Sequence, residues 1–364
     1  MTDEIAAAVG LADLGWSPVF QQQLTLEELE ALTPARVFAV QRSGLKLVFE
    51  GGEMDVPLGG RWFQGSPEDR PTVGDWVLLD RASGTVVRLL ERKSLLKRMS
   101  VSRPGDVQLI AANVDVLFLV SSCNEEFNLS RMERYLTLAL EAGVQPVVVL
   151  TKADLAEDPD SFRTAAEALG RDLVVEIVNA LDPASLDGLR AWCGRGQTVT
   201  LLGSSGVGKS TLINSLAGRD IQATGGIRED DAKGRHTTTH RSLHLLPGGG
   251  LLLDSPGMRE LGITDADVGL SSAFADVESL AALCRFNDCG HESEPGCAVR
   301  AAILAGELDE RRLQSYRKLR REELYNTETV AERHARVRQF SKMVKQHQAA
   351  SHKQTNKKPP RKRD

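Results

Sequence analysis

Apolar residues in this chain of 364 residues fall into short runs, and the spacing within the runs changes beyond residue 105. Between 35 and 101, apolar and polar positions alternate in segments broken by glycines and polar turns, as in ARVFAVQRSGLKLVFEGG (35–52) and DWVLLDRASGTVVRLLERK (75–93). Period-two alternation with frequent turns predicts a small antiparallel barrel. The alternation alone does not distinguish an OB-fold from an SH3-like barrel.

Beyond residue 105 the pattern is that of an α/β domain. Nearly continuous apolar runs, which are typical of parallel strands buried on both faces, lie at 108–119, 147–150, 173–178, 197–203 and 251–253. Helical spacing from Leu129 to Gly143 supplies the alternation of helix and strand that a parallel sheet requires. Residues 301–346 alternate apolar and charged positions at helical spacing, which predicts a helical C-terminal region.

The run at 197–203 leads directly into GSSGVGKS and then into a helical pattern at 211–217. A glycine-rich turn between a buried strand and a helix directs backbone N–H groups at a phosphate, and the helix N-terminus favours the same anion. Lys209 is therefore the expected catalytic cation that reaches the β- and γ-phosphates, and Ser210 is the expected Mg²⁺ ligand. The other residues expected to bind phosphate are Gly203, Ser204, Ser205, Gly206, Val207, Gly208 and Thr211. These features predict an NTPase site.

The run at 147–150 is followed at once by Thr151-Lys152-Ala153-Asp154. A carboxylate at this place accepts two hydrogen bonds from the guanine edge, whereas adenine has no such pair of donors and leaves the carboxylate unpaired. Lys152 is expected to lay its aliphatic stem along the base. This motif usually begins with Asn, and we expect Thr151 to preserve guanine specificity with weaker affinity. A single TKAD is weak support, but its pairing with a phosphate loop makes it strong.

The order of these two motifs is the reverse of that in an ordinary GTPase, where the phosphate loop comes first. If both motifs belong to one nucleotide site, the N- and C-termini of the domain must lie at a different point of the fold than in an ordinary GTPase. Asn179-Ala180, after the run at 173–178, fits a second base-contacting loop, although a plain strand-to-helix turn fits nearly as well. After the run at 251–253, Asp254 fits the carboxylate that holds Mg²⁺ through water, and the Gly257 N–H fits a γ-phosphate sensor.

Residues 225–240 (GGIREDDAKGRHTTTH) are rich in glycine, charge and threonine, and such a segment buries little apolar surface. It fits a switch loop that closes on Mg²⁺ through one of its threonines, with Thr238 as the residue of choice; a connector without a nucleotide role is the alternative. Met258 stands where many GTPases have the glutamine that orients water, so we expect slow intrinsic hydrolysis. His236 is a candidate catalytic group, and a solvated histidine is an equal alternative.

Three of the five cysteines lie close together with a histidine, in the pattern Cys284-x4-Cys289-x-His291-x5-Cys297. Three thiolates and one imidazole fill a tetrahedral zinc shell, and a complete shell favours a structural role over a catalytic one. A disulfide explains the cluster poorly, because three cysteines cannot all pair and no secretory signal precedes them. Cys123 and Cys193 lie in apolar or helical surroundings and are expected to be buried free thiols.

Composition limits the class of protein. The length predicts two or three domains, and no apolar window approaches a membrane span, so we expect a cytoplasmic protein without membrane contact. The net charge of −5 is uneven: residues 333–364 hold eleven Lys or Arg and one acid, so the rest of the chain carries −15. A basic tail on an acidic body favours a polyanionic partner, with a disordered solubility tail as the alternative.

Together, the phosphate loop, GRHTTT (234–239), DSPGMRE (254–260), the cysteine cluster and LGWSPVFQQQ (14–23) resemble the circularly permuted GTPases, and among them the ribosome small-subunit-dependent GTPase A (RsgA) family. The resemblance covers nearly the whole chain. It implies a multi-domain α/β protein: an N-terminal OB-fold barrel, a central permuted P-loop GTPase domain and a C-terminal helical zinc-binding domain. The resemblance also implies that the protein acts in late maturation of the small ribosomal subunit, and that the subunit stimulates its hydrolysis of GTP.

On this basis we expect an N-terminal extension (1–34), a barrel (35–105), a GTPase domain (106–275), a zinc-binding helical domain (276–348) and a disordered basic tail (349–364). The expected ligands are GTP or GDP with Mg²⁺ and one structural Zn²⁺, and the expected partner of a monomeric chain is the small subunit with its rRNA. Arg88, Arg92, Lys93, Lys97, Arg98 and Arg103 could line an RNA-facing surface, and an ordinary solvated face explains them nearly as well. An rRNA-binding chaperone whose GTP hydrolysis is incidental is the second hypothesis, while a small-molecule kinase conflicts with TKAD.

Overall fold

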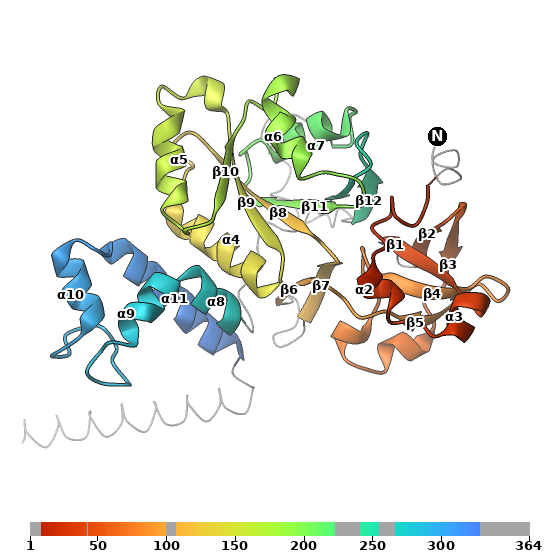
Figure 1. Ribbon diagram of the computed structural model, residues 1–364, viewed down its shortest axis with the longest axis horizontal. Helices are drawn as coiled ribbons and strands as arrows, with labels where there is room; N and C mark the ends of the chain where they lie inside the picture. Colours follow the sequence, from red (N-terminus) through yellow and green to blue (C-terminus); the bar gives the residue numbers. More distant parts are fainter. Residues whose placement is uncertain (1–8, 42, 100–106, 223–240, 255–265, 328–364) are drawn as a thin grey trace, which may run out of the picture.

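The computed structural model describes residues 9–41, 43–99, 107–222, 241–254 and 266–327. Figure 1 shows a β-barrel on one side, helices α8 to α11 on the other, and an α/β region between them. The strands of the α/β region are β8 (Val116–Ser122), β9 (Gln145–Thr151), β10 (Val174–Ile177), β11 (Thr198–Gly203), β12 (Ser242–Leu245) and β13 (Leu251–Asp254). Its helices are α4 (Leu129–Glu141), α5 (Pro159–Glu167), α6 (Asp187–Ala191) and α7 (Lys209–Ala217).

The strand order in the central sheet is β10-β9-β8-β11-β13-β12. The first five of these strands are mutually parallel, and β12 is antiparallel to β13. The chain enters at β8 in the middle of the sheet, extends outward through β9 and β10, and returns to β11 on the other side of β8. Strand order therefore reverses between β8 and β11, and the carboxyl ends of strands at such a point form the usual ligand crevice of an open α/β sheet.

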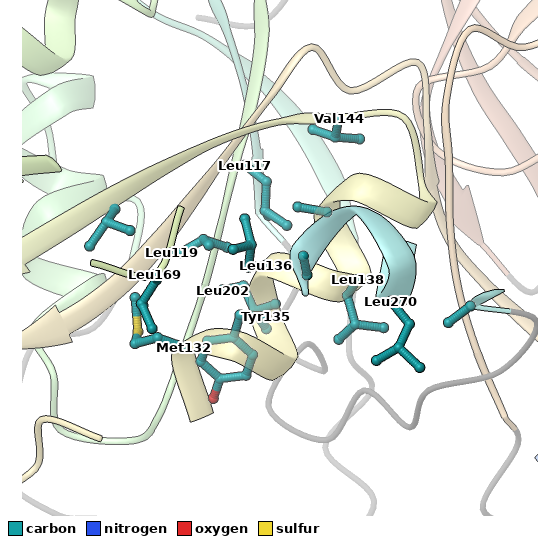
Figure 2. Close-up of a cluster of buried hydrophobic side chains, with 14 of the residues drawn as sticks. Leu117, Leu119, Met132, Tyr135, Leu136, Leu138, Val144, Leu169, Leu202 and Leu270 are labelled. Atoms are coloured by element: carbon teal, nitrogen blue, oxygen red, sulfur yellow. The ribbon is translucent and has the colours of Figure 1, made fainter. Parts of the chain in front are cut away.

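The two faces of the sheet have separate cores. Leu117 and Leu119 of β8 pack with Met132 and Leu136 of α4, as Figure 2 shows. Phe118 of β8 belongs to the opposite core, which also receives apolar side chains from α6 and α7. Burial on both faces explains why these strands have nearly continuous apolar sequences instead of alternating ones.

The barrel strands are β1 (Thr33–Gln41), β2 (Gly44–Phe49), β3 (Gly52–Val56), β4 (Trp76–Asp80) and β5 (Thr85–Leu89). Their order is β3-β2-β1-β4-β5, and no pairing between β3 and β5 is recorded in the described part of the chain. This is the partly open five-stranded barrel of an OB-fold. Short 3₁₀ helices lie at Gly60–Phe63 and Pro67–Asp69, and β6 (Leu95–Met99) pairs with β7 (Val107–Ala112) between the barrel and the central sheet.

Among the described residues, two kinds of contact help to fix the barrel to the α/β region. The first is a β1–β12 pairing, at Ala39 and Ser242, which makes one continuous sheet of the two regions. The second is the fully buried guanidinium of Arg36, which donates to the carbonyl oxygens of Leu14, Gly74 (3.2 Å) and Asn113 (3.0 Å). Arg36 thus connects the N-terminal segment, which contains α2 (Pro18–Gln21) and α3 (Leu26–Ala31), to the barrel and to the start of the α/β region.

The C-terminal helices are α8 (Asp267–Ala273), α9 (Ala275–Ala281), α10 (Ala298–Ala305) and α11 (Glu310–Thr327). The helical pattern predicted from residue 301 is therefore two helices within the described residues, separated at Gly306, whose φ of 77° ends α10. α8 packs closely on α4, because a Cβ at Gly269 would lie 2.3 Å from the Thr137 carbonyl oxygen. Leu270 and Leu138 meet at this contact, visible in Figure 2.

Across the described ranges, none of the helices combines the length and the apolar character that crossing a bilayer requires.

Candidate nucleotide site and metal centre

The phosphate loop begins where β11 ends, at Gly203, beside Val120 of β8. A Cβ on Gly203 would lie 2.3 Å from the Val120 carbonyl oxygen, so this position requires glycine. Gly208 precedes α7 with a φ of 88°, and α7 then begins at Lys209. The Lys209 ammonium donates to the carbonyl oxygens of Gly203 (2.8 Å) and Ser204 within the same loop. The loop therefore places this cation at the carboxyl end of β11.

The base-reading segment lies beside the phosphate loop. Thr151, the last residue of β9, is fully buried, and its hydroxyl lies 2.6 Å from the Val207 carbonyl oxygen and 3.1 Å from that of Ser121. A hydroxyl has one proton to donate, and the shorter distance assigns it to Val207. Two motifs that are 56 residues apart in the sequence are thus joined by one side chain.

Asp154 follows Thr151 in a 3₁₀ turn, Ala153–Leu155, and it is exposed. Lys152 precedes the turn in a left-handed conformation, with a φ of 59°. The predicted second base loop is attached to the phosphate-loop helix, because the Ser215 hydroxyl of α7 donates to the Ala180 carbonyl oxygen at 2.6 Å. Asn179 is held by Ser185, which follows in the 3₁₀ helix Pro183–Leu186. All three predicted loops therefore meet at one edge of the sheet.

Asp254, the last residue of β13, and Ser210, in the first turn of α7, approach one another through a third side chain. The Ser210 hydroxyl donates to the Oε1 atom of Gln222 at 2.8 Å, and the Nε2 atom of Gln222 donates to Asp254. Gln222 belongs to no recognisable motif, so its place in the site could not be predicted from the sequence. A hydroxyl and a carboxylate are hard oxygen donors of the kind that Mg²⁺ prefers, so the predicted magnesium ligands fit that ion.

A second residue that the sequence analysis missed is Arg131, near the start of α4. Its guanidinium donates to the Ser204 hydroxyl of the phosphate loop at 2.5 Å. The same turn of α4 contacts the C-terminal region: Ser130 and Ser315 form a hydrogen bond of 2.6 Å, and the buried Glu133 pairs with Arg311 and Arg312 of α11. α4 therefore contacts both the phosphate loop and α11.

The cysteine cluster forms the four-ligand group that the sequence predicted. Ligand atoms of Cys284, Cys289, His291 and Cys297 all lie within 4.8 Å of one another, so the group could hold a metal ion. His291 presents Nδ1, which lies 3.6 Å from the Cys284 sulfur and 3.5 Å from the Cys297 sulfur. The intervening loop is stabilised by Glu294, whose own N–H and those of Gly290 and Glu292 lower the pKa of its carboxyl to about 2. Cys123 and Cys193 are buried free thiols, as predicted.

Some predicted residues are not described by the structure. Thr238, His236, Gly257 and Met258 lie outside the described residues, as do Arg103 and the basic tail. The other basic residues proposed for an RNA-facing surface have partners within the protein: Arg88 with Glu28, Arg92 with Asp75, Lys93 with Asp115, Lys97 with Glu68, and Arg98 with Gln108. These side chains therefore have contacts within the protein, and the RNA-facing surface stays a prediction from the sequence.

A phosphate loop after β11 and a base-reading segment after β9, joined through Thr151 at the switch point of a parallel sheet, define a GTPase whose chain is circularly permuted. The chain belongs to the RsgA GTPase family and is a GTP-hydrolysing enzyme. A family model described as RsgA GTPase matches residues 89–264.

Curated relatives support this assignment over most of the chain. The "Small ribosomal subunit biogenesis GTPase RsgA 2" of Vibrio parahaemolyticus is 52% identical over 94% of this chain and 93% of its own length. The "Small ribosomal subunit biogenesis GTPase RsgA" of Mesorhizobium japonicum is 50% identical over 88% and 92%, respectively.

Solved structures are similar in fold. YjeQ from Thermotoga maritima matches with a TM-score of 0.59 and 27% identity, over 80% of this chain and 99% of that one. YloQ, described as a circularly permuted GTPase, matches with a TM-score of 0.58 over 82% and 97%; at 23% identity the likeness concerns the fold alone.

Proposed function

We propose that this GTPase binds the small ribosomal subunit and acts in its late maturation, hydrolysing GTP to GDP and phosphate with stimulation by the subunit. The observation that carries the proposal is the 52% identity, over 94% of the chain, to a relative named as a small ribosomal subunit biogenesis GTPase. The meeting of three nucleotide-binding loops at one sheet edge supports the same chemistry.

Each loop has a distinct role in the proposed pocket. Asp154 accepts hydrogen bonds from guanine, Lys152 packs along the base, and Asn179-Ala180 closes its far edge. The residues from Gly203 to Thr211 surround the phosphates, and the Lys209 ammonium exchanges its present carbonyl partners for β- and γ-phosphate oxygens. This exchange is favourable because a charged acceptor makes a stronger hydrogen bond than a neutral carbonyl.

Ser210 would ligate Mg²⁺ directly and Asp254 would hold it through water. When bound, the ion neutralises charge on the phosphate oxygens during transfer. Thr238, Gly257 and His236 remain proposed from the sequence as the switch ligand, the γ-phosphate sensor and a catalytic group.

We propose Zn²⁺ for the cysteine cluster. Zinc bonds of about 2.3 Å to sulfur and about 2.0 Å to nitrogen give tetrahedral edges of about 3.8 Å between sulfurs and about 3.5 Å between sulfur and nitrogen. The Cys284 and Cys297 sulfurs lie 3.9 Å apart, close to the expected distance between two sulfurs. Their distances to His291 Nδ1, 3.6 Å and 3.5 Å, match the expected distance between sulfur and nitrogen. The ion would be structural, because the protein fills all four positions.

The domain boundaries stated above are proposed for this chain, as are a monomeric state and a cytoplasmic location. We assign contact with rRNA to the basic C-terminal segment 333–364, which holds eleven Lys or Arg, together with the zinc-binding region. Binding through phosphate contacts predicts an affinity that falls steeply with salt.

The test is GTP turnover with and without purified small subunits at moderate salt, with large subunits as the matched control. We expect a rise of about 100-fold or more with small subunits, since completing a GTPase site in trans has effects of that size or larger. An unchanged rate would refute the proposal. A single-turnover rate unaffected by the subunit, with binding still dependent on GTP, would support the chaperone hypothesis instead. Lys209→Ala should abolish turnover, and full activity in that variant would contradict the phosphate-loop assignment.

A further inference from the structure

The side chain of Gln222 lies between two residues that come from different elements of the site. Its Oε1 atom accepts a hydrogen bond from the Ser210 hydroxyl at 2.8 Å, and its Nε2 atom donates to the Asp254 carboxylate. Ser210 is in the first turn of α7, whereas Asp254 ends β13. A carboxamide has both an acceptor and a donor at one end, so one side chain satisfies the hydroxyl and the carboxylate together.

The backbone of Gln222 is held in place by Asn214 of α7, which is buried. The Oδ1 atom of Asn214 accepts from the N–H groups of Ile221 (2.9 Å) and Gln222 (2.8 Å), and its Nδ2 atom donates to the Gln222 carbonyl oxygen at 2.7 Å. Two hydrogen bonds accepted and one donated by this buried amide fix the chain just beyond α7. The orientation of the Gln222 carboxamide is thus determined by the fold at both its backbone and its side-chain ends.

The chemistry of a magnesium ligand gives this arrangement a purpose. A serine hydroxyl that ligates Mg²⁺ must direct a lone pair at the ion, so its proton needs an acceptor elsewhere. Gln222 Oε1 is such an acceptor for Ser210. Likewise, the Nε2 atom donates to Asp254 Oδ1, so the other carboxylate oxygen, Oδ2, is the one proposed to hold a water of the ion. Residues that orient metal ligands in this way commonly change metal affinity by about 10- to 100-fold.

We propose that Gln222 is a positioning residue for the Mg²⁺ of the nucleotide complex, acting through Ser210 and Asp254 without touching the ion. The inference rests on the proposed role of those two residues as magnesium ligands. The alternative is that the carboxamide competes with the ion for Ser210, and the two possibilities predict opposite effects on Mg²⁺ affinity. A positioning residue increases affinity for Mg²⁺, whereas a competitor decreases it.

The experiment measures the Mg²⁺ concentration that gives half-maximal slowing of the release of a fluorescent GDP analogue from the full-length protein. In Gln222→Met, which keeps the length of the side chain but neither hydrogen bond, we expect this concentration to rise by about 10-fold or more. GDP affinity in excess EDTA should stay within about twofold of wild type, and high Mg²⁺ should restore slow release. The matched control is Gln145→Met, because Gln145 begins β9 and is exposed.

The outcomes separate the inference from the proposed function. If wild-type protein binds GDP with no dependence on Mg²⁺, the assignment of Ser210 and Asp254 to the ion is wrong. If wild type depends on Mg²⁺ and Gln222→Met has the same half-maximal concentration, the inference about Gln222 is overturned. A lower concentration in the variant would identify Gln222 as a competitor. Lower GDP affinity of Gln222→Met in EDTA would indicate a general structural defect and would also contradict the proposal. Gln222→Glu is a second variant for the same measurement, because glutamate retains the acceptor for the Ser210 hydroxyl.

Discussion

The Thr151 hydroxyl at the end of β9 donates to the Val207 carbonyl oxygen in the phosphate loop, at 2.6 Å, and both groups are buried. Thr151, which stands where this motif usually has asparagine, therefore links the base-reading segment directly to the phosphate loop. The link is short because β9, β8 and β11 are adjacent strands of one sheet.

Thr151→Val tests this link, because valine has the shape of threonine without the hydroxyl. The Val207 carbonyl would lose its buried donor, and an unsatisfied buried polar group costs about 1–3 kcal/mol. We expect lower stability to urea and GDP affinity reduced by about 10-fold, measured by equilibrium unfolding and by titration with a fluorescent GDP analogue. Thr151→Ser keeps the donor and should behave nearly as wild type. A loss in Thr151→Ser with none in Thr151→Val would mean that packing of the methyl group matters, rather than the hydrogen bond.

Glu133 of α4 is the buried partner of Arg311 and Arg312, with a side chain that is 1% exposed. Removing one member of a buried ion pair typically costs about 3–5 kcal/mol, because the other charge loses its partner. Arg312 would retain Asp276 and the Ala273 carbonyl, so for Glu133→Ala we expect a loss near the lower limit, measured by urea unfolding.

The control for that variant is Asp187→Ala, which removes an exposed ion pair with Arg190. Exposed pairs contribute about 0–1 kcal/mol, so this variant should unfold almost as wild type does. Similar losses in the two variants would show that α4 and α11 do not depend on the buried pair.

Removal of metal should act locally. The ligand loop contacts α11, where Arg317 donates to the Gly290 carbonyl at 2.8 Å and to Glu292. We therefore expect a chelator, or Cys297→Ser, to increase hydrogen exchange in residues 284–327 while GDP affinity changes by less than about twofold. Bound zinc measured per chain should fall from one to zero in parallel. Loss of GDP affinity together with the metal would contradict this separation.

The lowered pKa of His244 in β12 makes the stability of the protein depend on pH. Burial lowers the pKa of its imidazole, more than the nearby Asp254 raises it. Above the unfolded value of about 6.5, His244 is neutral in both states and contributes no pH dependence. As the pH falls below about 6.5, the unfolded chain takes up a proton that folded His244 resists, so the free energy of unfolding decreases.

For His244→Gln, we expect stability to fall less between pH 7.5 and 5.5 than in wild type, measured by urea unfolding at each pH. The comparison with wild type removes the contributions of other titrating groups, which include His291. Identical pH profiles would show that His244 titrates normally in the folded protein.

The sequence by itself determined those sites of this protein for which one short segment contains all the residues that the site needs. GSSGVGKS contains the glycines and the lysine that a phosphate loop needs, and Cys284, Cys289, His291 and Cys297 are four ligands at a suitable spacing. The reversed order of TKAD and the phosphate loop also identified the permutation before any contact was known. Such features depend on residue type, on short spacing or on the order of motifs along the chain, all of which a sequence states directly.

Only the tertiary structure decided which side chains from distant segments meet. Gln222 and Arg131 carry no motif, and they acquire contacts with the site because α7, β13 and α4 pack around the end of β11. The same cause pairs Arg92 with Asp75 and Lys93 with Asp115, contacts that no sequence pattern predicted. A side chain's partners depend on strand order and helix packing over the whole chain. A local pattern shows which face of an element is apolar, but not which other element will cover that face.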